Sequence, residues 1–253
     1  MLHFFDCDLG VVGSGQGLPA LQTPQAALTW MDRYTIERAL VYDRAVMEAG
    51  VFDRFDALLD FCRLAGDRLS PTIPVAPPAT GESPPPDELV GIILAHGIKA
   101  VRCWPVEHAC IFDPFNFGAL LERLQPHRIP VIVHLSEVHA WTRRDGYDEL
   151  RETAQAFPDL PIVLLSSGML DGRKLLPLLD GCPNIIADLT CVTYQFIEYV
   201  TERWGSGRLV FASHHPRIDP GLYLPWINYS GIDQQAREAL AWRTAARLVE
   251  GIR

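Results

Sequence analysis

Three ionisable residues far apart in the sequence, Asp8, His134 and His214, each stand at or just after the end of an apolar run. One carboxylate and two imidazoles form a common ligand set for a single zinc, manganese or iron ion. The same groups could also act without a metal, because imidazole titrates near neutral pH and a carboxylate can orient it as a base. They could equally line a metal-free polar pocket. Asp8, His134 and His214 are therefore the candidate catalytic residues, and the metal stays open.

Six more residues at the ends of apolar runs are candidates for substrate binding: Asp6, Arg102, Trp104, Ser166, Asp188 and His215. Arg102 has a planar guanidinium group that suits a substrate carboxylate. Structural roles compete with these. Asp6 could form a buried ion pair with Arg102, and His215 could face a helix layer, because neighbouring strand residues alternate in direction.

Eight short apolar runs must position these side chains. Most are continuously apolar, as strands covered on both faces are. The third is the weakest candidate, because Pro71 and Pro74 cannot donate backbone hydrogen bonds. The runs span residues 2–7, 36–42, 69–75, 98–104, 129–135, 160–166, 184–190 and 208–213.

Amphipathic segments alternate with these runs and carry helix signals. Thr23 and Pro24 supply a cap and a first-turn proline for 24–34, and further helices are expected over 86–96, 114–125 and 233–250. Alternating strands and helices form a parallel sheet, and eight such units close a barrel of about 250 residues. We therefore predict a single (β/α)₈ TIM barrel over residues 1–253, with any site at the carboxyl ends of its strands.

Composition excludes several classes of partner. The chain is 48% hydrophobic and 21% charged, with a net charge of −9. Nucleic acids and anionic membranes both select clustered lysine and arginine, which this chain lacks. It has no signal peptide, no apolar run long enough to span a membrane and no CxxC pair, so we expect a cytoplasmic protein with reduced thiols. Tyr223, Trp226 and Tyr229 could cover the pocket or form a homo-oligomer contact.

The strand ends resemble those of the amidohydrolase-related barrels, which include metal-dependent hydrolases and decarboxylases. IKAVRCWPVEHACIFDPFNFGALLERLQPHRIPVIVH is similar to their fourth and fifth strands, and LPIVLLSSG with CPNIIADLT to their sixth and seventh. RLVFASHHPRIDP resembles their eighth strand, and ALAWRTAARLV their last helix. The resemblance covers nearly the whole chain, although no single motif is intact.

The resemblance implies a metal at the barrel mouth, held by His-x-His on strand one, one histidine each on strands five and six, and an aspartate on strand eight. Here Asp8-Leu9-Gly10 replaces the first pair, and His134 keeps the strand-five position. Ser166 and His214 stand at the other two positions. A binuclear centre is therefore not expected, and either no metal or a single one remains.

Two functions from different classes follow. The first is a hydrolase for a small carboxylated, lactone or ester substrate, using His134 and His214 with Asp8; decarboxylation on the same frame is less favoured. The second is a catalytically inactive relative that binds a small molecule or serves as an assembly subunit. The surviving His134 and the ionisable replacements place the hydrolase slightly ahead, but a shared fold alone establishes neither.

Overall fold

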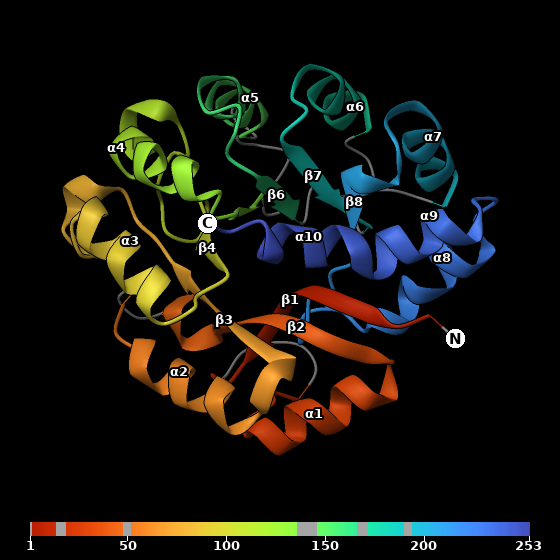
Figure 1. The fold of residues 1–253 in the computed structure, drawn as a ribbon, viewed down its shortest axis with the longest axis horizontal. Coiled ribbons are helices and arrows are strands. Elements are labelled where there is room, and N and C mark those ends of the chain that lie inside the picture. Colours follow the sequence, from red (N-terminus) through yellow and green to blue (C-terminus); the bar gives the residue numbers. More distant parts are fainter. Residues whose placement is uncertain (1, 14–18, 48–51, 136–145, 166–171, 190–193) are drawn as a thin grey trace.

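The computed structural model describes residues 2–13, 19–47, 52–135, 146–165, 172–189 and 194–253. Its eight parallel strands are hydrogen-bonded in sequence order, which confirms the predicted (β/α)₈ architecture (Figure 1). The strands are β1 (Phe4–Val11), β2 (Ile36–Asp43), β3 (Leu69–Pro74), β4 (Ala100–Cys103), β5 (Val131–His134), β6 (Ile162–Leu165), β7 (Ile185–Asp188) and β8 (Leu209–Val210).

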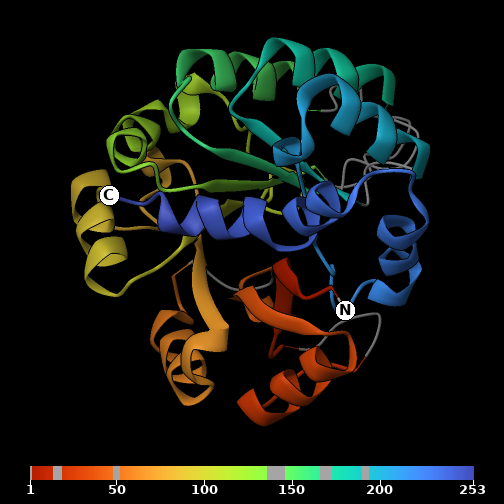
Figure 2. The same ribbon diagram turned by 45° about the vertical axis from the view of Figure 1, so that its right-hand side comes forward.

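Helices surround the strands in a ring (Figures 1 and 2). Those predicted over 24–34, 86–96 and 114–125 form within one residue of the expected ends. The helices are α1 (Pro24–Arg33), α2 (Phe55–Leu64), α3 (Pro86–Ala95), α4 (Pro114–Leu124), α5 (Tyr147–Ala156), α6 (Gly172–Gly181), α7 (Tyr194–Trp204), α8 (Leu224–Tyr229), α9 (Gln234–Glu238) and α10 (Thr244–Glu250). A π-helical turn joins α9 to α10, which accounts for the helix predicted over 233–250. Among the described residues, no helix has the length and apolarity needed to cross a membrane.

Strand β3 forms despite its two prolines. Each proline lacks a donor but keeps its carbonyl, and that of Pro71 accepts the backbone N–H of Lys99 at 3.0 Å. The ladder continues past the strand, where Val75 N–H donates to the carbonyl of Arg102 at 2.8 Å. The prolines therefore weaken the sequence signal without breaking the sheet.

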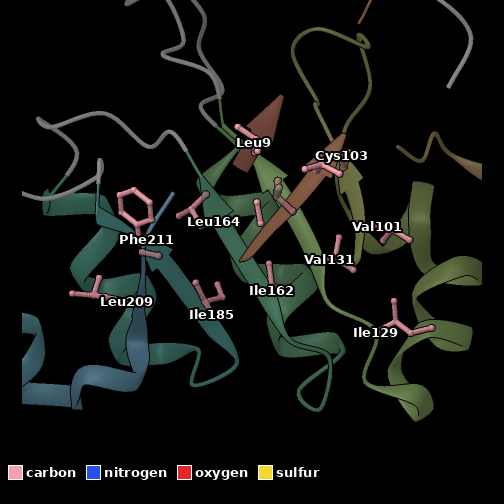
Figure 3. Packing of buried hydrophobic residues seen from close by; sticks show 14 of the residues in the cluster. Leu9, Val101, Cys103, Ile129, Val131, Ile162, Leu164, Ile185, Leu209 and Phe211 are labelled. Atoms are coloured by element: carbon pink, nitrogen blue, oxygen red, sulfur yellow. The ribbon is translucent and has the colours of Figure 1, made fainter. Parts of the chain in front are cut away.

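The outer faces of the strands form the larger core, against the helices. Side chains such as Leu9, Val101, Val131 and Leu164 lie on this face (Figure 3). Each of these four side chains is fully buried. Burying an aliphatic side chain of this size stabilises the fold by about 1.5–3 kcal/mol, so this layer supplies most of the favourable free energy.

The inner faces form a second cluster that fills the lower barrel. Its strand members include Phe5, Leu40, Ala100 and Ile132. Helix α10 crosses the middle of the ring (Figures 1 and 2), and its Val249 packs in the same cluster. The amino-terminal end of the barrel is thus closed by apolar packing, which leaves the carboxyl ends of the strands for a polar site.

Candidate functional site

A bulge in β1 brings Asp8 into the barrel. Cys7 belongs to the inner cluster, whereas Leu9 belongs to the outer core. The register of β1 against β2 shifts between Asp6 and Leu9, as an inserted residue requires. Asp8 reaches residues of β4 and the segment after β8 because this shift turns its side chain inward.

Arg102 of β4 is the centre of the site. Its side chain is fully buried, and each of its five N–H donors has an acceptor. The guanidinium carbon also lies 4.7 Å from the ring centroid of Tyr42. The acceptors are Thr72 Oγ1 at 2.6 Å, Asp8 Oδ1 at 2.7 Å, His134 Nε2 at 3.1 Å, Cys7 O at 2.7 Å and Leu40 O at 3.3 Å.

His214, just after β8, lies between two carboxylates. Its Nδ1 is 2.8 Å from Asp8 Oδ2, and its Nε2 is 3.0 Å from Asp188 Oδ2. Because ionised carboxylates only accept, both nitrogens must donate, and the ring is an imidazolium. Burial acts to lower the pKa of His214, but the charges and hydrogen bonds of Asp188 and Asp8 raise it to about 9.

Two further features fix this ion-paired group. His214 has φ of +54°, in the left-handed region that residues with a Cβ rarely adopt, so its contacts must hold a strained backbone. Burial acts to raise the pKa of Asp8, yet the hydrogen bond and charge of His214 and the charge of the Arg102 guanidinium hold it well below its ordinary value. Asp8 is therefore ionised and serves two cations at once.

His134 is neutral, unlike His214. Burial lowers the pKa of His134 to about 3; the charge of Asp8 opposes this shift, and the positive charges of Arg102 and His214 add to it. Arg102 can only donate, so Nε2 of His134 accepts and the ring proton lies on Nδ1. Trp104 stacks on the ring with centroids 4.7 Å apart. At 7% exposure, the His134 side chain is the most accessible of the group that includes Asp8, Arg102, Asp188 and His214.

Asp6 and His215 lie away from this group. Asp6 Oδ1 accepts the backbone N–H groups of Asp8 and Ser213, both at 2.8 Å, and so ties β1 to the segment after β8. Burial raises its pKa to about 6, although those hydrogen bonds oppose the shift. The ring of His215 packs against Trp30 of α1 with centroids 4.5 Å apart. Asp8, rather than Asp6, is thus the carboxylate that pairs with Arg102.

The donor set does not fit a divalent metal. Both carboxylate oxygens of Asp8, both nitrogens of His214 and Nε2 of His134 are already engaged within the group. A Cβ at Gly10 would lie 2.8 Å from the carbonyl oxygen of His215 and 2.9 Å from the side chain of Arg44, so no ligand side chain fits there. Among the residues that the structure describes, no group of three His, Cys, Asp or Glu side chains is arranged to hold a metal ion.

Sequence reasoning missed Thr72 and Tyr42. The Thr72 hydroxyl accepts from Arg102 Nε and donates to the carbonyl of Val41 at 2.7 Å. Tyr42 packs against Trp104 with ring centroids 5.1 Å apart. A threonine within an apolar strand and an aromatic residue at a strand end were the available signals. Ser166 lies outside the described residues.

Comparison with known proteins identifies the lineage. A family model of amidohydrolases matches residues 17–250. The chain belongs to the amidohydrolase family. No curated protein sequence matches it.

Solved structures with the same fold are distant from this chain in sequence. An uncharacterized TIM-barrel protein from Bordetella bronchiseptica is 17% identical over 99% of both chains, with a TM-score of 0.79. A dihydroxybenzoic acid decarboxylase from Polaromonas, with bound manganese and 2-nitroresorcinol, is 14% identical over 99% of this chain and 97% of that one, with a TM-score of 0.71. A probable 2-pyrone-4,6-dicarboxylic acid hydrolase from Acinetobacter baumannii, with citric acid bound, is 14% identical over 98% and 100%, with a TM-score of 0.70. At these identities the similarity shows the fold alone.

Proposed function

We propose that this member of the amidohydrolase family is a hydrolase for a small carboxylated lactone or ester, which it binds at the barrel mouth above His134. The observation that carries the proposal is the neutral His134 beside the buried cation of Arg102. The group lies at the carboxyl ends of the strands, where TIM-barrel enzymes hold their active sites. Members of the family are enzymes, which supports catalysis in general.

His134 has the chemistry of an electrophilic donor. Because Arg102 donates to Nε2, it withdraws electron density from the ring and makes the Nδ1 proton a stronger donor. Hydrolysis of an ester develops negative charge on the carbonyl oxygen, and a preorganised donor in a buried site stabilises that charge. Trp104 fixes the ring plane from one side. We therefore assign His134 to the oxyanion and not to the base.

Two arginines near the mouth favour an anionic substrate. The side chain of Arg44 lies beside Gly10 of β1, and Arg217 is exposed in the segment after β8. The charge of Arg217 also acts on His134. Positive charge around a low-dielectric opening attracts carboxylates and orients them by bidentate pairing. The substrate class is therefore proposed as carboxylated.

The proposal is tested with a panel of carboxylated lactones and esters. We expect wild type to turn over at least one, and His134→Ala to lower kcat/KM by about 100-fold or more, as loss of an oxyanion donor does. His3→Ala is the matched control, because His3 is exposed at the opposite end of β1 and should keep full activity. Equal activity in wild type and His134→Ala would contradict the proposed role.

A second function, binding without catalysis, is favoured by one specific observation. Asp8 is held ionised between two cations, Nε2 of His134 accepts from Arg102, and His214 is protonated on both nitrogens, so none of them is poised as a base to activate water. Calorimetric titration with the same panel separates the two functions. Saturable binding of a carboxylate that is lost in Arg217→Ala, with no turnover by wild type, would establish the binding protein.

A further inference from the structure

Two positive and two negative charges balance one another at the barrel mouth. Arg102 and His214 carry the positive charges, and Asp8 and Asp188 carry the negative ones. None of the four side chains is more than 3% exposed. Arg102 contacts Asp8, Asp8 contacts His214, and His214 contacts Asp188. Asp8 and His214 therefore each touch two partners of opposite charge.

We propose that Arg102 and His214 together replace a divalent metal ion, so that this barrel mouth is permanently metal-free. Their combined charge of two is that of a divalent metal ion, and a Polaromonas decarboxylase of the same fold has manganese bound. A carboxylate and an imidazole that could serve as metal ligands instead meet each other directly, with Asp8 Oδ2 2.8 Å from His214 Nδ1. Nδ1 of His214 holds its proton in this hydrogen bond, so it has no lone pair to offer a metal.

An incoming metal ion could displace the Arg102 guanidinium from Asp8 only at a large cost in free energy. A metal that took Asp8 would leave Arg102 buried without its carboxylate and would add positive charge beside it. It would also have to remove a proton from His214, which is held by two carboxylates. Breaking one partner of a buried ion pair leaves an uncompensated charge in a medium of low dielectric constant. The site is therefore closed to metals by charge, and neither His214 nor Nε2 of His134 has a lone pair left to bind one.

Backbone contacts show that the cation site is built for a guanidinium group. The carbonyl oxygens of Cys7 and Leu40 both accept from Nη2 of Arg102. The Thr72 hydroxyl accepts from Nε at 2.6 Å. Acceptors on three different strands, β1, β2 and β3, thus match the planar fork of one arginine. The inference does not rest on the proposed hydrolase activity, because a binding protein would carry the same internal charges.

Metal content of the wild-type protein tests the inference without an activity assay. Protein from cells grown with added zinc or manganese is dialysed against each ion and analysed for bound metal. We expect less than about 0.1 equivalent per chain, and a Tm that differs by less than about 1 °C between EDTA and metal, because an ion that binds only the folded state would raise it.

One result would overturn the inference: about one equivalent of zinc or manganese in wild type that disappears in Asp8→Asn. If Asp8→Asn does not fold, His134→Gln provides the same comparison through the more accessible residue of the group. Metal that Asp8→Asn or His134→Gln retains is bound elsewhere, and the barrel mouth is then metal-free as proposed.

Discussion

The two ends of the barrel interior differ within two residues of the same strands. On β4, Ala100 belongs to the apolar inner cluster and Arg102 to the ionic group. On β5, Ile132 and His134 repeat the change. The amino-terminal end of the barrel interior is filled by packed apolar side chains, and the carboxyl-terminal end is filled by paired charges. One strand can thus carry an apolar layer that tolerates substitution and, two residues further on, a polar layer that does not.

Energetics explain the difference in tolerance. Shortening an apolar side chain removes a few contacts and leaves a small cavity. Removing one member of a buried ionic group leaves its partners charged and desolvated. Substitutions in the apolar layer should therefore lower the free energy of unfolding by small amounts. A single substitution in the ionic layer should disrupt the whole group and cost much more.

The largest effect is expected for Arg102→Met. The substitution keeps volume but leaves Asp8, Thr72 and two backbone carbonyls without their donor. We expect a loss of about 3–5 kcal/mol in the free energy of unfolding, measured by urea denaturation at pH 7. Arg63→Met is the control, because Arg63 is 73% exposed and pairs only with Asp60 at the surface. A stability equal to wild type would show that the ionic layer is dispensable.

A smaller effect is expected from pH. The folded pKa of His214 is raised from 6.5 to about 9, so its stabilisation is complete below pH 6.5 and is lost as pH rises through 9. Across this window the difference amounts to about 3 kcal/mol. Denaturation at several pH values should show the decline in wild type and a flatter profile in His214→Gln. Parallel profiles would mean that the two carboxylates do not hold an imidazolium.

The smallest effect is expected in the apolar layer. Ile132→Val removes one methylene-sized group from a fully buried side chain and should cost about 1 kcal/mol. The same denaturation series measures it, and the pH profile should stay that of wild type. A loss as large as that of Arg102→Met would erase the distinction between the two layers.

The sequence predicted the architecture because strand and helix signals alternate along the whole chain. It also placed Asp8, His134, His214, Arg102 and Asp188 at strand ends, and the structure brings these five together. Hydrophobic periodicity suffices for this, since the carboxyl ends of parallel strands meet at one edge.

The pairing within the group could not be predicted. Side-chain direction reverses when a strand gains one residue, and nothing in FFDCDLG marks the register shift between Asp6 and Leu9. The sequence therefore offered Asp6 as a partner of Arg102, whereas the bulge gives that place to Asp8. Protonation could not be predicted either, because it depends on which atoms each imidazole faces. His134 and His214 are the same residue type, yet His134 is neutral and His214 is positively charged.

Gly10 leaves no room for a side chain where β1 meets the segment after β8. A side chain there would meet the carbonyl oxygen of His215 at 2.8 Å, so the backbone must move before a histidine can fit. A Gly10→His substitution alone would therefore disrupt the backbone hydrogen bond between Gly10 and His215, which joins β1 to the segment after β8. A ligand side chain could therefore be introduced at position 10 only together with other changes that move the backbone of His215. For protein engineering, this glycine is the main steric obstacle to a histidine on this part of β1.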